Sequence, residues 1–119
     1  MIGTNDRKEP NGMQHLADNL VSMIESISEI GKLIILMSAN PVTIQDDRYS
    51  NRLYSQHEVN EVIKLIANQK KVCLINHYEW IKKELLLIEK TLEEVLLASD
   101  GDGLHPTDDV HEMMFGHVI

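Results

Sequence analysis

The chain has 119 residues and a formal net charge of −8, and its apolar content is 43% although aromatic residues make up only 4%. A chain of this length forms one domain with a small core. An aliphatic composition with few aromatic residues favours helices packed on helices over a β-sheet. Five of the excess negative charges fall in residues 99–119 and the longer segments are near neutral, which argues against a basic nucleic-acid surface.

The sequence also indicates a compartment. Cys73 is the single cysteine, so an intramolecular disulfide is excluded and a reducing compartment is the simpler expectation. Residues 1–12 are polar and lack the apolar core of a signal peptide, and no apolar run has the length of a membrane span. We therefore expect a protein of the cytoplasm or nucleus that is not secreted, enters no membrane, and uses no cofactor or metal ion.

A first helix is predicted over about residues 12–38, after a disordered segment at residues 1–11. Asn11 followed by Gln14 is a capping-box pattern, and Asn40-Pro41 disfavours helical angles. Apolar residues recur at steps of 4 and 3, the spacing of a heptad seam, and polar residues follow the opposite face. The seam residues are Leu16, Leu20, Met23, Ile27, Ile30, Ile34 and Met37.

A second, longer helix is predicted over about residues 55–98, after a loop at residues 39–54. Ser55 with Glu58 is a capping box, and no glycine or proline follows before Gly101. Lys70 interrupts the heptad rhythm with an extra step of four, which predicts a bend or local unwinding. The seam residues of this helix are Val59, Ile63, Ile66, Leu74, Tyr78, Ile81, Leu85, Ile88, Leu92 and Val95.

Residues 99–119 are predicted to be an acidic flexible tail that carries a short docking segment. Pro106 and Thr107 can open a short helix, and the two acids that follow suit the positive end of its dipole. This segment would fold back or bind another chain through its apolar residues, which are Val110, Met113, Met114 and Phe115.

The expected architecture is all-α: a helical hairpin of unequal arms, residues 12–98, with coiled-coil-like packing. An antiparallel pair would leave about a third of the longer helix without intramolecular cover, because the first arm has about 26 residues and the second about 43. The middle of the longer helix is also apolar on two faces. We therefore expect oligomerisation or partner subunits to complete a helical bundle.

One spacing resembles a catalytic motif. Arg52 and His57 have the R-x4-H arrangement of HEPN-type ribonucleases, which are small helical dimers. The resemblance implies a dimer in which these two residues act on RNA phosphate, with the histidine as acid–base group. The other interpretation is that Arg52 is a loop charge and His57 a solvated residue of the first helical turn, so no catalytic residue is favoured.

Two further groups contain residue types that occur in metal or nucleophilic sites. Cys73 and His77 would share a face of the second helix, but no second ligand pair accompanies them, and Cys73 between apolar neighbours is predicted to be a small core residue. The tail acids, which are Asp100, Asp102, Asp108 and Asp109, do not follow the EF-hand pattern and are predicted to be solvated.

The function predicted from these patterns is a non-enzymatic protein–protein interaction module, acting as an oligomeric adaptor or as one subunit of a larger helical complex. The heptad seam residues of both predicted helices would be its contact surface, and its partner would be itself or another protein. Two alternatives remain open: a HEPN-like ribonuclease dimer that uses Arg52 and His57, and a small inhibitor or regulator of phage or plasmid type that binds a target protein.

Overall fold

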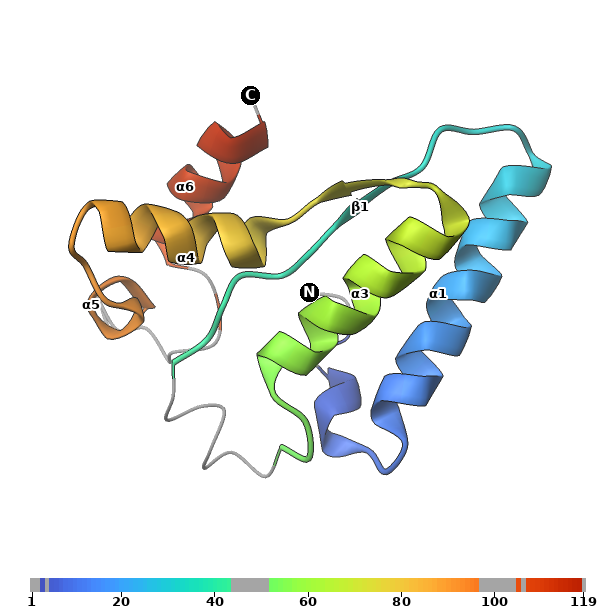
Figure 1. The fold of residues 1–119 in the computed structure, drawn as a ribbon, viewed down its shortest axis with the longest axis horizontal. Helices are drawn as coiled ribbons and strands as arrows, with labels where there is room; N and C mark the ends of the chain where they lie inside the picture. Colours follow the sequence, from blue (N-terminus) through green and yellow to red (C-terminus); the bar gives the residue numbers. More distant parts are fainter. Residues whose placement is uncertain (1–2, 4, 44–51, 97–104, 106, 119) are drawn as a thin grey trace.

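The computed structural model describes residues 3, 5–43, 52–96, 105 and 107–118. The described chain is mostly helical, with one small sheet. Its elements in order are the 3-10 helix η1 (Asn5–Lys8), α1 (Gly12–Glu29), β1 (Ile35–Met37), α3 (Gln56–Lys70), β2 (Cys73–Ile75), α4 (His77–Leu87), α5 (Leu92–Leu96) and α6 (Asp108–Val118). The helices α1 and α3 lie at one end of the molecule and α4 to α6 at the other, with the two strands between them (Figure 1).

The first core forms where α1 packs against α3. The two helices lie side by side and run in the same direction, because β1 returns the chain between them (Figure 1). They are therefore not the two arms of the predicted helical hairpin. The buried residues of this core are Leu16, Leu20, Ile24, Val59, Ile63 and Ile66.

The ends of α1 show what the sequence pattern predicted and what it missed. The helix begins at Gly12, close to the predicted start, but Asn11 makes no side-chain cap and adopts a φ of 58°. The helix ends at Glu29, nine residues before the predicted end. Gly31 has a φ of 70° and its N–H donates to the carbonyl of Ser28, so a glycine in the left-handed region terminates the helix.

Two short strands occupy segments that were expected to be helical. The strands β1 and β2 form a parallel two-stranded sheet in which Ile35 pairs with Cys73 and Met37 with Ile75. The ladder continues for one more bond, from the N–H of Ser38 to the carbonyl of Ile75 at 3.0 Å. A parallel connection requires a crossover, and α3 lies within it.

The predicted helix over residues 55–98 is broken into three helices. It begins as expected, because Ser55 Oγ accepts from the N–H of Glu58 at 3.1 Å and the Glu58 carboxylate accepts from the N–H of Ser55 at 2.7 Å. The capping box is thus confirmed. The helix α3 then ends at Lys70, the residue that interrupts the heptad rhythm, because Lys71 adopts a left-handed φ of 56°. Asn76 caps the next helix, α4, by accepting from the N–H of Glu79.

A second core forms where α4, α5 and α6 meet. Its buried residues are Ile81, Leu85, Val95, Leu96 and Val110. The predicted short helix after Pro106 is confirmed as α6, and Thr107 Oγ1 donates to the carbonyl of Val95 at 2.7 Å. This segment folds back within the chain: Val110 is buried, Met113 and Met114 are partly buried, and Phe115 is exposed. The predicted flexible stretch at residues 99–104 lies outside the described residues.

The N-terminal segment is ordered where it is described, contrary to the prediction for residues 1–11. The side chain of Arg7 is fully buried: its Nε donates to the carbonyl of Tyr54 at 2.8 Å and its Nη1 to Gln56 Oε1 at 3.3 Å. The Arg7 carbonyl also accepts from the N–H of Leu53 at 2.6 Å. These contacts join η1 to the segment that leads into α3.

The heptad residues do not form one continuous apolar stripe in the structure, because they differ in how far they are buried. Those that are buried in the two cores or beside them are Leu16, Leu20, Val59, Ile63, Ile66, Tyr78, Ile81, Leu85 and Val95. Those that are partly buried are Ile27, Ile34, Leu74 and Leu92, and those that are exposed are Met23, Ile30, Met37 and Ile88. In α1 the residue that completes the buried stripe is Ile24, which lies one residue beyond the predicted Met23.

Candidate functional site

The parallel sheet has one covered and one bare face. Leu36 and Leu74 pack against the core of α1 and α3. Side chains alternate along a strand, so the neighbouring positions point to the opposite side. On that side Ile35 is 50% exposed, Met37 is 46% exposed and Cys73 is exposed, whereas Ile75, which pairs with Met37, is partly buried. Parallel sheets are almost always covered on both faces, so the described residues form an incomplete layer.

The bare face continues beyond the first strand. Leu33 precedes β1 by two residues, lies on the same side as Ile35 and Met37 by alternation, and is 86% exposed. We call Leu33, Ile35, Met37 and Cys73 the outer sheet face. It is a row of apolar side chains with one thiol and no charged group. It can bind apolar protein surface, but it carries no group for acid–base chemistry.

Polar side chains gather at the carboxyl ends of the strands, the end at which ligands bind in many α/β sheets. Ser38 follows β1, and its Oγ donates to Asn76 Oδ1 at 3.2 Å and accepts from the N–H of Tyr78 at 3.1 Å. Both bonds tie the end of β1 to the start of α4. The role of Ser38 in the described structure is therefore to join the two ends of the molecule.

A second buried polar group lies beside it. Gln56, the first residue of α3, donates through Nε2 to the carbonyl of Asn40 at 3.3 Å, and Asn40 Nδ2 donates to the carbonyl of Pro41 at 2.8 Å. Gln56 also accepts from Arg7. All of these polar side chains are buried. They are neutral amides and one guanidinium, which bind polar groups and hold loops, and they do not form an acid–base pair.

Asn60 lies one helical turn beyond Gln56. Its side chain is buried, and neither its Oδ1 nor its Nδ2 has a hydrogen-bond partner in the described structure. An unsatisfied buried amide costs about 1–3 kcal/mol. We therefore expect Asn60→Leu, which keeps the number and branching of the side-chain heavy atoms and removes the polar ones, to raise the melting temperature by several degrees.

Thermal unfolding followed by circular dichroism would measure this gain. Asn68→Leu is the matched control, because Asn68 lies on the same helix with its side chain exposed. The melting temperature of the control should change little. A loss of stability in Asn60→Leu would mean that the amide of Asn60 is hydrogen-bonded in solution.

The candidate catalytic residues occupy different surroundings. His57 lies in the first turn of α3, is exposed, and has Nε2 3.8 Å from a carboxylate oxygen of Glu61. Arg52 is half-buried in the segment before that helix. The described structure adds no group that would assemble a phosphate site around them, and the ribonuclease activity stays a prediction, to be tested by RNA cleavage with purified protein.

The predicted pairing of Cys73 with His77 on one helix is wrong. Cys73 lies in β2 and is exposed, whereas His77 begins α4 and is fully buried. Cys73 is exposed because it points to the bare side of the sheet, so the prediction of a small core residue is also wrong. Within the described residues, His, Cys, Asp and Glu side chains form no cluster of three or more that could hold a metal ion. Asp108 and Asp109 are exposed, and the other two tail acids lie outside the described residues.

Sequence reasoning missed one aromatic cluster. His117 of α6 contacts His77, with 3.1 Å between the two Nδ1 atoms, and stacks on Trp80 with ring centroids 4.5 Å apart. Burial, and to a smaller extent the charge of His117, lowers the pKa of His77. The contact joins residues 40 positions apart, so no local spacing could have indicated it.

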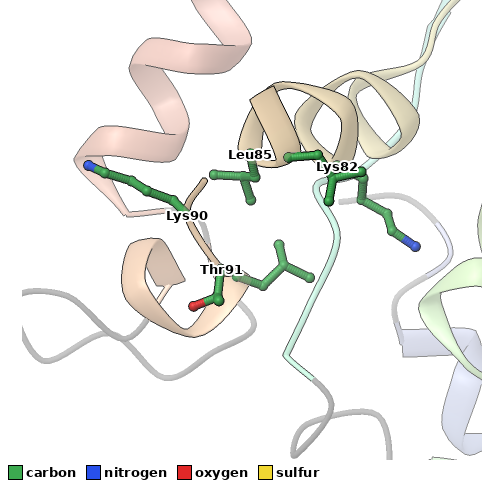
Figure 2. A pocket seen from close by; sticks show the side chains of 6 residues that line it. Lys82, Leu85, Lys90 and Thr91 are labelled. Carbon is green, nitrogen blue, oxygen red and sulfur yellow. The ribbon is translucent and has the colours of Figure 1, made fainter. Parts of the chain in front are cut away.

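A shallow groove of about 270 Å³ lies between α4 and the turn before α5. Leu85 lies at its wall, whereas Lys82 and Lys90 lie on opposite sides with their ammonium groups directed away from it (Figure 2). Leu86, Thr91 and Leu92 complete the lining. The groove is therefore an aliphatic depression without a charge that would select a ligand.

In the part of the chain that the structure describes, no helix combines the length and the apolar character needed to cross a bilayer. No protein-family model matches the sequence, and no curated protein or solved structure is significantly similar to it.

Proposed function

We propose that the protein is a protein–protein interaction module, an oligomeric adaptor or a subunit of a larger complex, and that it binds through the outer sheet face. The single observation that supports this most strongly is the bare side of a parallel sheet. Its apolar side chains at Leu33, Ile35 and Met37 are between 46% and 86% exposed. A second protein chain that covers them would complete the layer and remove this apolar surface from water.

This proposal changes the contact surface expected from the sequence while keeping the function. Most heptad residues lie in the chain's own cores, where a partner cannot reach them. The exposed seam residue Met37 instead belongs to the outer sheet face. The two strands also offer edges to which an extended segment could add, because each is paired on one side in the described sheet.

Cys73 provides a direct probe of this surface. It is the single cysteine, it lies on the outer sheet face, and it pairs in register with Ile35. A partner that covers this face must slow the reaction of the thiol with a water-soluble disulfide reagent. If the partner is a second copy, the labelling rate falls as protein concentration rises, in parallel with an increase in mass measured by light scattering. A different partner would protect the thiol only in an extract of the source organism.

The double variant Ile35→Lys/Met37→Lys tests the assignment. Both side chains are exposed, so folding measured by circular dichroism should be retained while two charges oppose burial of the face. We expect rapid labelling of Cys73 under all conditions and a monomeric mass. Leu65→Lys is the matched control, because Leu65 is equally exposed on α3 and outside this face, and it should behave as the wild type. Full reactivity of wild-type Cys73 both at high concentration and in extract would contradict the proposal.

A further inference from the structure

The C-terminal helix α6 is held on α4 by a pair of histidines. The His77 and His117 rings meet edge to face, with centroids 5.0 Å apart and Nδ1 atoms 3.1 Å apart. The His117 ring also stacks on Trp80, with an interplanar angle of 6°. His77 is fully buried and its Nε2 has no hydrogen-bond partner in the described structure. The His117 ring is therefore partly exposed to water, whereas the His77 ring is not exposed to it.

The distance between the two nitrogens limits how many protons the contact can hold. At 3.1 Å one imidazole nitrogen must donate a hydrogen bond and the other must accept it. A single proton therefore lies between the two Nδ1 atoms. When both rings are protonated, both nitrogens carry hydrogen and both rings are positively charged, so the contact becomes repulsive. Separation of the helices places both rings in water, where each can bind its proton.

The charged side chains of α3 and α4 near the histidine pair form their interactions with other residues. Glu79 pairs with Lys64 of α3, with 2.7 Å between nitrogen and oxygen. The Lys82 ammonium lies 5.2 Å above the ring of Tyr78, and the His57 ring lies 6.0 Å from the same ring. Glu84, the other acid of α4, lies seven residues beyond His77, about 10 Å along the helix at 1.5 Å per residue.

The charged groups of α6 do not compensate it either. Asp108 and Asp109 lie in the first turn of the helix, at the opposite end from His117. His111 and Glu112 are exposed. Among the described residues no carboxylate contacts either ring of the histidine pair, so the pair has no partner that would favour its doubly charged form.

We propose that the histidine pair is a proton-sensitive latch: it holds α6 on α4 at neutral pH and releases it in mild acid. Release uncovers the apolar surface that α6 covers, which includes Ile81, Leu85 and Val95. The acid-released form would thus present a second apolar surface, distinct from the outer sheet face, together with a freed helix that carries Val110.

The direction of the pH dependence follows from the pKa of His77, which burial, and then the charge of His117, lowers below its ordinary value of about 6.5. The released state therefore binds one proton more than the docked state over the range below pH 6.5. Docking is complete above that pH and weakens as the pH falls through it. One additional proton shifts the equilibrium by at most about tenfold per pH unit.

Trp80 is the single tryptophan and is stacked on His117, so its fluorescence reports on the docking of α6. We would titrate the full chain from neutral to mildly acidic pH and measure hydrogen exchange in parallel. The expected result is a change in Trp80 emission below about pH 6.5, with faster exchange in residues 107–118 while α1 and α3 stay protected.

The double variant His77→Leu/His117→Phe removes both imidazoles and keeps an aromatic ring for the stack on Trp80. Since burial is the larger cause of the lowered pKa of His77, both histidines must be replaced to abolish the pH response, and we expect the release transition below about pH 6.5 to be lost. His111→Gln removes an exposed histidine of the same helix and should show the same transition as the wild type. Retention of the wild-type midpoint in the double variant, or simultaneous loss of protection in α1 and α6, would overturn the proposal.

Discussion

Ile81→Asp is expected to unfold the helical unit formed by α4, α5 and α6. Ile81 is fully buried in the second core, whose side chains come from all three helices. An aspartate there would lose the apolar contacts and bury a carboxylate without a partner. The expected cost exceeds about 4 kcal/mol, which is a large part of the roughly 5–15 kcal/mol that stabilises a small domain.

Urea unfolding followed by circular dichroism measures this cost, and hydrogen exchange shows where it falls. Ile88→Asp is the matched control. The two residues occupy equivalent positions of the predicted heptad seam, but Ile88 is 52% exposed. A continuous seam predicts similar effects at both positions, whereas the structure predicts a change of about 0.5 kcal/mol or less at Ile88. Equal destabilisation by the two substitutions would contradict the described core.

The same comparison explains why the sequence indicated two long helices. The runs Leu33-Ile-Ile-Leu-Met37 and Val72-Cys-Leu-Ile75 are continuously apolar, so they satisfy a 4-3 spacing at whatever phase is chosen. Continuous apolar runs are also typical of buried parallel strands, and short runs do not distinguish the two. The distinguishing signals were Gly31 and Lys71, which take left-handed angles before each run and end the helices.

Helix caps and helix starts were predictable where they depend on residues close together in the sequence. The Ser55–Glu58 capping box and the short helix after Pro106 rest on contacts within a few residues, whereas α1 begins at Gly12 without the predicted side-chain cap of Asn11. A stripe of apolar residues also identified much of both cores. The parallel direction of α1 and α3 could not be predicted, because it depends on a strand that the pattern concealed.

The candidate sites depended on contacts between distant segments, which periodicity does not report. His77 meets His117 across 40 positions, and Ser38 meets Tyr78 across the same separation. The burial of Cys73 depends on which face of a strand it occupies, so a helical pattern predicts the wrong environment for it. Polar residues in the core, such as Asn60, have no sequence signal, because the same residue on the other side of a helix would be solvated.

The effect of substituting Arg7 on stability is where the prediction from the sequence and the prediction from the structure differ most. A disordered N-terminal segment would tolerate its loss. In the structure its guanidinium is fully buried and donates to the Tyr54 carbonyl and to Gln56, so Arg7→Met should leave both acceptors without these donors in the interior. We expect a loss of roughly 2–5 kcal/mol in the free energy of unfolding, measured in urea.

Two further variants test whether the stabilising effect of Arg7 depends on the geometry of its guanidinium, on its charge or on its position in η1. Arg7→Lys keeps the charge but cannot supply two donors in the fixed fork of a guanidinium, so it should lose nearly as much stability as Arg7→Met. Lys8→Met alters the next residue of η1, which is exposed, and should change the free energy of unfolding by about 0.5 kcal/mol or less. Equal effects of Arg7→Met and Lys8→Met would mean that η1 does not join the segment before α3, whereas a large difference would show that the N-terminal residues are part of the folded domain.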